Sequence, residues 1–143
     1  MAVLGFYNMS DERQYDDIRA GVKRLCDSFP GAYWRDKDEH RSYPVEFVDA
    51  LTAAGYLSVM IPEVYGGAGL PLGAACAILE EIHRSGCNGG ACHAQMYTMG
   101  TLLRHGSEAQ KQRYLPEVAS GALRLQAFGV TEPNSGTDTT RIR

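Results

Sequence analysis

The sequence lacks any apolar run approaching the roughly 20 residues that a membrane-spanning helix needs. It also lacks an excess of positive charge, because 14 Lys and Arg residues face 17 Asp and Glu residues and give a net charge of −3 at pH 7. This balance argues against nucleic acid as a main partner. Its N-terminus has neither the basic and long apolar segments of a secretory signal nor the Arg-rich character of a transit peptide. These absences predict a cytoplasmic protein without a membrane span.

The length and composition are those of an ordinary folded domain. The chain has 143 residues, which is enough to bury one hydrophobic core. Apolar residues make up 44% of the chain and charged residues 22%, as in typical globular proteins. No internal repeat or low-complexity segment is present. We therefore expect a globular protein.

Cysteines are few and irregularly spaced, at positions 26, 76, 87 and 92. A reducing cytosolic setting disfavours disulfides between them. Two thiols and two imidazoles nevertheless form a candidate set of zinc ligands: His83, Cys87, Cys92 and His93. Glycines at positions 86, 89 and 90 indicate instead a plain turn between two helices. We favour the turn and assign no metal.

An apolar stripe predicts the first helix. Its members recur at spacings of three and four: Tyr15, Ile18, Val22, Leu25 and Phe29. Ser10 can cap the start of this helix, and Pro30-Gly31 is expected to end it. The stripe is interpreted as core.

Residues 32–70 are predicted to hold one helix between less regular segments. Residues 32–43, which hold a mixed charge run, are predicted to be a polar connector. Residues 44–55 are predicted to form a helix that begins at a proline and ends near a glycine. A short extended piece is expected over residues 56–61. The glycine-rich loop at 62–70 lacks the features of a phosphate-binding loop, so we assign it a structural role.

Three more helices are predicted in the second half. One begins at Pro71 and buries an apolar face up to Ile82. Residues 91–105 form the most apolar helix, which is expected in the middle of a bundle. Ser107 and Gln110 have the spacing of a capping box at the start of the last helix, and Ser120-Gly121 is expected to stop it.

The C-terminal stretch carries the polar residues of interest. Leu123–Val130 is apolar and predicts a short strand that stops before Pro133. Asn134–Gly136 predicts a tight turn, after which Thr137 and Asp138 present a free hydroxyl and a free carboxylate. Such a strand end can receive a polar, phosphate-bearing ligand. An ordinary strand–turn rich in polar residues fits these residues as well.

Three motifs resemble those of the acyl-CoA dehydrogenase flavoproteins. The stretch 129–138, Gly-Val-Thr-Glu-Pro-Asn-Ser-Gly-Thr-Asp, is similar to the family's first signature. The stretch 61–69, Ile-Pro-Glu-Val-Tyr-Gly-Gly-Ala-Gly, resembles its N-terminal fingerprint. The stretch 106–116, Gly-Ser-Glu-Ala-Gln-Lys-Gln-Arg-Tyr-Leu-Pro, resembles one of its helices. The motifs occur in the family's order, so the resemblance spans most of the chain.

The resemblance implies a mainly α fold. Residues 1–122 would form the family's N-terminal α-helical bundle domain, and residues 123–143 would begin its middle β-domain with the first strand. Members of the family are much longer than this chain. A lone strand needs a partner for its backbone hydrogen bonds, which independently suggests a truncated chain.

The resemblance also implies a function. The full protein would oxidise an acyl-CoA thioester to its 2-enoyl form with FAD, in fatty acid metabolism. A glutamate base would take the α-proton while the flavin takes the β-hydride. That glutamate falls beyond Arg143, so no catalytic residue is assigned in this chain. Electrons would pass to an electron-transfer flavoprotein, and the full-length form would be a homo-oligomer, a dimer or a tetramer.

Site residues are carried over from the family motifs. The implied cofactor-binding residues are Phe128, Gly129, Val130, Thr131, Gly136 and Thr137. The implied substrate-binding residues are Thr137, Gly90, His93 and Tyr97. His93 and Tyr97 are one turn apart and can share a helix face, where they could equally be satisfied polar groups at a helix contact. Arg141 departs from the signature, which usually has a small residue there.

Two classes of alternative stay open. The chain could be a catalytically inactive helical fragment or an interaction module. It could also come from a relative with the same fold, such as an acyl-CoA oxidase or a flavin monooxygenase. The oxidase differs in what reoxidises the flavin, which these residues do not reveal.

Overall fold

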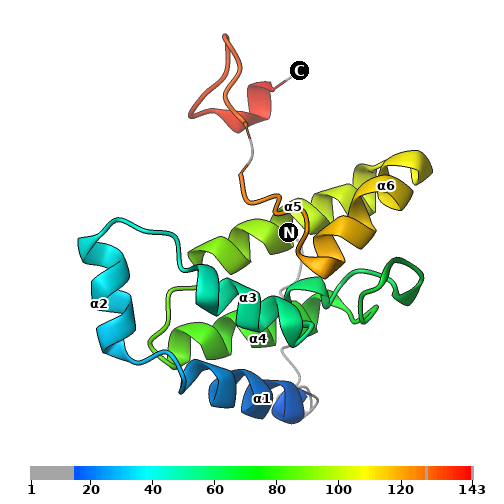
Figure 1. The fold of residues 1–143 in the computed structure, drawn as a ribbon. Coiled ribbons are helices and arrows are strands. Elements are labelled where there is room, and N and C mark those ends of the chain that lie inside the picture. The colour runs from blue at the N-terminus through cyan, green and yellow to red at the C-terminus, as the bar shows by residue number, and fades with distance from the viewer. Residues whose placement is uncertain (1–14, 128, 143) are drawn as a thin grey trace, which may run out of the picture.

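The computed structural model describes residues 15–127 and 129–142, and within them the chain is built from α-helices joined by short loops (Figure 1). The α-helices are α1 Asp16–Cys26, α2 Gly31–Glu39, α3 Val45–Ala53, α4 Leu72–Arg84, α5 Gly90–His105 and α6 Glu108–Ser120. The short 3₁₀ turns named within the described residues are η3 Tyr56–Ser58, η4 Glu63–Tyr65 and η5 Thr139–Arg141. Among the described residues, no helix combines the length and the apolar character needed to cross a bilayer.

One hydrophobic core joins these helices. α1 packs against α4, α5 against α6, and α3 contacts both α1 and α6, while α2 lies at one end of the molecule (Figure 1). The largest fully buried apolar side chains are Val22, Phe47, Val48, Leu51, Leu57, Ile61, Ile78, Ile82, Met99, Leu115 and Val118. Each such side chain contributes roughly 1.5–3 kcal/mol relative to an exposed one. The mainly helical fold predicted from sequence is confirmed.

Local signals placed several helix ends correctly. Pro71, in an extended conformation, directly precedes α4. Ser107 Oγ accepts from the backbone N–H of Gln110 at 3.2 Å, and the Gln110 side chain accepts from the backbone N–H of Ser107 at 2.8 Å. Gly121 ends α6 with a φ of 79°, a left-handed conformation that favours glycine. The Ser10 cap predicted for the first helix lies outside the described residues.

The predicted polar connector over residues 32–43 is wrong, because residues 31–39 form α2. Pro30 has extended backbone angles and starts this helix after α1 has already ended at Cys26. The indole of Trp34 lies edge-on to Phe47 with ring centroids 4.9 Å apart, and its Nε1–H donates to the backbone oxygen of Phe29 at 3.0 Å. Tertiary packing of this aromatic residue therefore stabilises a helix that its own polar sequence does not predict.

The extended piece predicted over residues 56–61 is also wrong. Gly55, with a φ of 78°, turns the chain, and residues 56–58 form η3. Leu57 and Ile61 are almost completely buried. The apolar character that suggested an extended segment therefore reflects burial of a tight turn in the core.

The strand expected over Leu123–Val130 is not formed. The described part of this segment, residues 123–127 and 129–130, has no regular secondary structure. A strand exists only when its backbone groups pair with a neighbouring strand, and the described residues contain none. The domain boundary between residues 122 and 123 stays a prediction.

Candidate functional site

The C-terminal residues 129–142 stand off from the helical body as a compact turn (Figure 1). Glu132 and Ser135 exchange two backbone hydrogen bonds, with N–H donors 2.8 and 3.1 Å from their acceptors. The Ser135 hydroxyl, which is buried, donates to the backbone oxygen of Asp138 at 2.6 Å. Asp138 in turn accepts from the backbone N–H of Thr140 at 3.2 Å. A tight turn held by its own polar groups is therefore present, but it lies at Pro133–Asn134, between Glu132 and Ser135, and overlaps the predicted Asn134–Gly136 only in part.

The described members of the predicted cofactor-binding set are mostly exposed. Gly129, Thr131, Gly136 and Thr137 are exposed, and Val130 is half-buried. Phe128 lies outside the described residues. A Cβ built at Gly136 would meet the methyl group of Thr131 at 3.9 Å, so the two halves of the signature are neighbours. In the described part of the chain, the hydroxyls of Thr131 and Thr137 bond to no protein group.

These groups fit one edge of a flat polar ligand. Exposed hydroxyls can donate or accept, and the glycine leaves room for close approach. The fit is to an edge only, because the turn stands off from the helices (Figure 1). A flavin bound here would need a second wall from outside the described residues.

The predicted substrate-binding residues lie along α5. Gly90 and His93 are exposed and Tyr97 is half-buried. The rings of His93 and Tyr97 meet edge to face, with centroids 5.3 Å apart and planes at 83°. The prediction that they share a helix face is confirmed, while their role stays a prediction.

A cleft of about 1110 Å³ opens beside the start of α5. Gly90, Ala91 and Ala94 line its α5 side. Trp34 and Tyr43 line the opposite side, and both come from the α2–α3 region. Neither His93 nor Tyr97 lines this cleft. The structure therefore sets Gly90 at a cleft and the other two predicted residues on a different side of α5.

A buried amide network that the sequence did not reveal links this region to the C-terminal segment. Gln95 of α5 is fully buried, and its Nε2 donates to the backbone oxygen of Leu57 at 3.4 Å. Its Oε1 accepts from Gln126 Nε2 at 3.3 Å. The hydroxyl of Tyr43 donates to Gln126 Oε1 at 2.6 Å, and burial raises the pKa of Tyr43. A glutamine inside the most apolar helix was the available signal for this network.

Arg124 makes the second attachment of the same segment. Its guanidinium pairs with the carboxylate of Asp49 at 2.5 Å and donates to the Thr52 hydroxyl at 3.2 Å. Both partners belong to α3. Residues 124 and 126 therefore tie the chain to α3 and α5 immediately before the signature turn. No sequence pattern predicts the two Arg124 contacts, because Thr52 and Asp49 are 72 and 75 positions away from Arg124 in the sequence.

The candidate zinc set does not come together. Within residues 15–127 and 129–142, no three His, Cys, Asp or Glu side chains are placed to hold a metal ion. Cys87 and Cys92 are buried, whereas His83 and His93 are exposed. Residues 85–89, which include Gly86 and Gly89, form the turn between α4 and α5 that the favoured interpretation expected.

Comparison with known proteins assigns the helical body to one family. The family described as "Acyl-CoA dehydrogenase, N-terminal domain" matches residues 12–122. A probable acyl-CoA dehydrogenase of Mycobacterium leprae is 32% identical over 132 residues, covering 91% of this chain and 33% of that protein. The glutaryl-CoA dehydrogenase of Desulfococcus multivorans is 34% identical over 139 residues, covering 92% and 34%.

Other relatives and a solved structure agree. The (2S)-methylsuccinyl-CoA dehydrogenase of Cereibacter sphaeroides is 33% identical over 146 residues, covering 99% of this chain and 26% of that protein. A solved structure titled as an electron transferring flavoprotein of Acidaminococcus fermentans matches with a TM-score of 0.74 and 26% identity, over 95% of this chain and 36% of that one. The chain thus spans between about a quarter and about a third of the length of these relatives.

Proposed function

The chain belongs to the acyl-CoA dehydrogenase family, and from that premise we propose that it is the N-terminal portion of a flavin-dependent acyl-CoA dehydrogenase. The whole protein would oxidise an acyl-CoA thioester to 2-enoyl-CoA. The family match over residues 12–122 carries the proposal. The relatives named as dehydrogenases of different acyl-CoA esters support the reaction class and leave the acyl group open.

FAD would be held at the signature turn. Bound FAD supplies the two-electron acceptor for such a reaction. The exposed hydroxyls of Thr131 and Thr137 and the backbone around Gly129, Val130 and Gly136 offer the polar groups that would meet its edge. Phe128 belongs to the same proposed set. The Arg124 and Gln126 contacts support this role, because they hold the chain in place just before the turn.

The acyl group would lie near α5, with Gly90, His93 and Tyr97 as proposed contacts and Thr137 shared between cofactor and substrate. The base that removes the α-proton is not assigned to any residue here. We further propose an electron-transfer flavoprotein as electron acceptor, a homo-oligomeric full-length form and a cytoplasmic location. The four unpaired cysteines suit a reducing compartment.

The direct test is isolation of the native protein through an antibody against this chain, followed by intact mass, visible absorption and acyl-CoA-dependent dye reduction. We expect a mass above the 15.6 kDa of this chain, flavin absorption bands and dye reduction with at least one acyl-CoA. A protein of the 143-residue mass that takes up no added FAD would favour the helical interaction module instead.

A variant pair tests the proposed flavin contact in that protein. Thr131→Val removes one exposed hydroxyl and keeps the side-chain volume. We expect the affinity for flavin to fall about tenfold, which corresponds to the loss of one hydrogen bond to the bound flavin. Thr139→Val removes an exposed hydroxyl from the same segment, outside the proposed contact set. Equal flavin affinity of the two variants would contradict the assignment of Thr131.

A further inference from the structure

Two buried cysteines meet where α1 and α4 end. Cys26 is the last residue of α1, and Cys87 lies in the turn between α4 and α5, with exposed fractions of only 3% and 5%. The sulfur of Cys87 lies 3.9 Å from the backbone oxygen of Cys26 and 4.0 Å from that of Phe29. The Cys87 thiol also contributes, after burial, to the raised pKa of the Cys26 thiol. Two thiols 61 positions apart in sequence are therefore direct neighbours.

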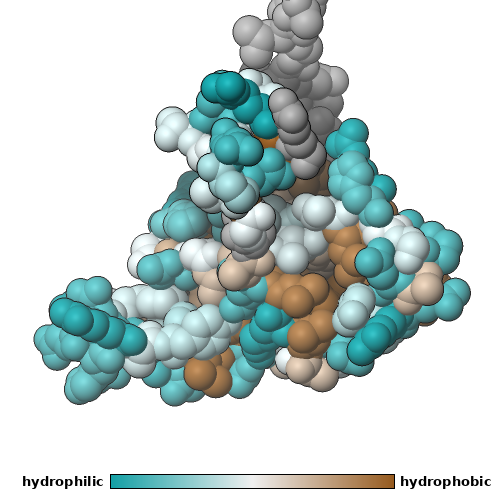
Figure 2. Space-filling view, turned by 90° about the horizontal axis from the view of Figure 1, so that it is seen from above, coloured by the Kyte–Doolittle hydropathy of each residue, from teal (hydrophilic) through white to brown (hydrophobic). Residues whose placement is uncertain are grey.

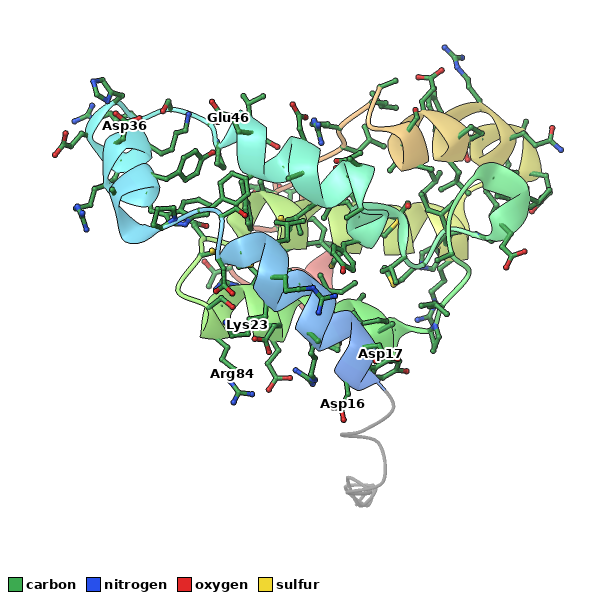
Figure 3. All side chains as sticks on the ribbon, turned by 60° about the horizontal axis from the view of Figure 1, so that its bottom comes forward. Asp16, Asp17, Lys23, Asp36, Glu46 and Arg84 are labelled. Atoms are coloured by element: carbon green, nitrogen blue, oxygen red, sulfur yellow. The ribbon has the colours of Figure 1, made fainter. Side chains whose placement is uncertain are left out.

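The local backbone holds this arrangement in place. Gly86, with a φ of 78°, ends α4, and its N–H donates to the backbone oxygen of His83 at 3.0 Å. The N–H of Cys87 donates to the backbone oxygen of Ile82 at 3.1 Å, which closes the helix end and turns the Cys87 side chain inward. Lys23 and Arg84, in the last turns of α1 and α4, lie on the same side of the molecule (Figure 3). The two helices thus finish together, with the cysteines between them.

We propose that Cys26 and Cys87 form a dithiol site that hydrogen peroxide oxidises to a disulfide joining α1 to the α4–α5 turn. One sulfur attacks the peroxide oxygen and becomes a sulfenic acid as the first water leaves. The second sulfur attacks that sulfenic sulfur, the S–S bond forms, and the second water leaves. In total, two thiols lose their hydrogens and two electrons, and hydrogen peroxide is reduced to two waters.

The pair differs from the other two cysteines in its direct contact, because the Cys87 sulfur reaches the Cys26 backbone. Cys87 acts on Cys92 only through a weaker electrostatic effect, which adds to that of burial in raising the pKa of Cys92. Cys76 is exposed on α4, and its oxidation ends at a sulfenic or higher acid in the absence of a partner. Cys92 is fully buried on α5. A disulfide needs two Cβ atoms at close range, and it is the Cys87 sulfur that touches the backbone of another cysteine, Cys26.

Burial sets the expected rate. Burial first, and the neighbouring Cys87 second, raise the pKa of the Cys26 thiol to about 12, so its thiolate is scarce at neutral pH. Oxidation of the pair therefore requires local opening at the end of α1. Residues beside both cysteines are already exposed: Asp27 and Ser28 after α1, and Gly86 after α4. We expect the pair to react more slowly than Cys76.

The test is non-reducing peptide mapping of the full chain after hydrogen peroxide treatment and alkylation of the remaining thiols. The expected product is a Cys26–Cys87 cross-link, with the loss of two hydrogen atoms from the intact mass and full reversal by a dithiol reductant. Because the disulfide closes a loop of 61 positions, the thermal midpoint should rise by about 10 °C. A cross-link that involves Cys92, or acids at both sulfurs without a cross-link, would overturn the proposal.

Matched variants separate the pair from general oxidation. Cys87→Ala should abolish both the cross-link and the rise in thermal midpoint, whereas Cys92→Ala, at an equally buried site, should leave both intact. Cys76→Ala should remove only the fast, uncoupled oxidation. If Cys87→Ala does not fold, the peptide map of the unsubstituted chain still decides the outcome.

Discussion

Glu46 shows how one charged residue joins two elements. It lies at the start of α3 on the side toward α2 (Figure 3), where its carboxylate pairs with Lys37 at 3.0 Å and accepts from the Tyr33 hydroxyl at 2.9 Å. Its own backbone N–H, then Lys37 and Tyr33, lower the pKa of Glu46 from 4.5 to about 2. Burial and the hydrogen bond to Glu46 raise the pKa of Tyr33 to about 12. Both shifts favour the same bonded pair at neutral pH.

The sign of the resulting pH dependence follows from these shifts. Because the folded pKa of Glu46 is lowered, its contribution to stability is present above pH 4.5 and is lost as the pH falls toward about 2. We expect Glu46→Gln to flatten the decline of the thermal midpoint in this window. Glu63→Gln, at an exposed site in the 3₁₀ turn η4, serves as the control and should leave the slope unchanged. The same slope in both variants would exclude the Glu46 cluster as its source.

At the scale of elements, two glycines that end helices differ in how much space a side chain would have. Gly55 and Gly121 both have left-handed φ values, of 78° and 79°. A Cβ at Gly55 would meet no atom within 4 Å, whereas a Cβ at Gly121 would lie 2.7 Å from the Thr52 methyl group. The first position therefore isolates the backbone cost of a side chain, and the second adds a steric clash.

These differences predict the effects of substitution. Gly55→Ala should destabilise the fold by about 1 kcal/mol from the left-handed conformation alone. Gly121→Ala should cost roughly 2–4 kcal/mol, because overpacking against Thr52 is added. Denaturant unfolding measures both. In a Thr52→Ser background, which removes the methyl group and keeps the hydroxyl that Arg124 contacts, the cost of Gly121→Ala should fall toward that of Gly55→Ala. An unchanged cost in that background would show that the clash is not its cause.

Elements set by local chemistry could be predicted from the sequence. The capping box of Ser107, the stop at Gly121 and the turn between Glu132 and Ser135, which the sequence predicted slightly later in the chain, all depend on residues within four positions of one another. In the candidate site, the shared face of His93 and Tyr97 follows equally from helix geometry.

Elements set by distant partners could not be predicted. α2 depends on the packing of Trp34 against Phe47, and the segment after Gly121 depends on partners in α3 and α5. The strand predicted over 123–130 failed for the same reason, because apolar character marks burial or packing and does not identify the neighbour that a strand needs. The Gln95–Gln126 link shares this limit: its two residues are 31 positions apart.

At the scale of the molecule, the face from which the C-terminal segment rises is not uniformly polar. Figure 2, which looks onto this face, shows apolar side chains gathered between polar ones. An apolar pocket of about 510 Å³ between α5 and α6 is closed on one side by Leu123 and Leu125. Residues 123–126 therefore act as part of the helical body, although they follow its last helix.

This attachment predicts different outcomes for two truncations. A chain that ends at Ala127 loses the signature turn, whose hydrogen bonds at Glu132, Ser135 and Asp138 lie within the turn itself, and should keep its thermal midpoint within a few degrees. A chain that ends at Ala122 should be much less stable. It loses the half-buried Leu123 and Leu125, the Arg124–Asp49 ion pair, and Gln126, whose side chain donates to the Gln95 amide oxygen.

The second truncation should lower the free energy of unfolding by about 3 kcal/mol, from two partly buried leucines and the lost polar contacts. For a chain of this size that corresponds to a fall in the thermal midpoint on the order of 10 °C. Gln126→Ala in the untruncated chain should reproduce about 1 kcal/mol of it, and Gln112→Ala, on the exposed side of α6, none. If both truncations had the same midpoint, residues 123–126 would belong with the segment that follows, and the structural boundary of the helical domain would lie at Ala122.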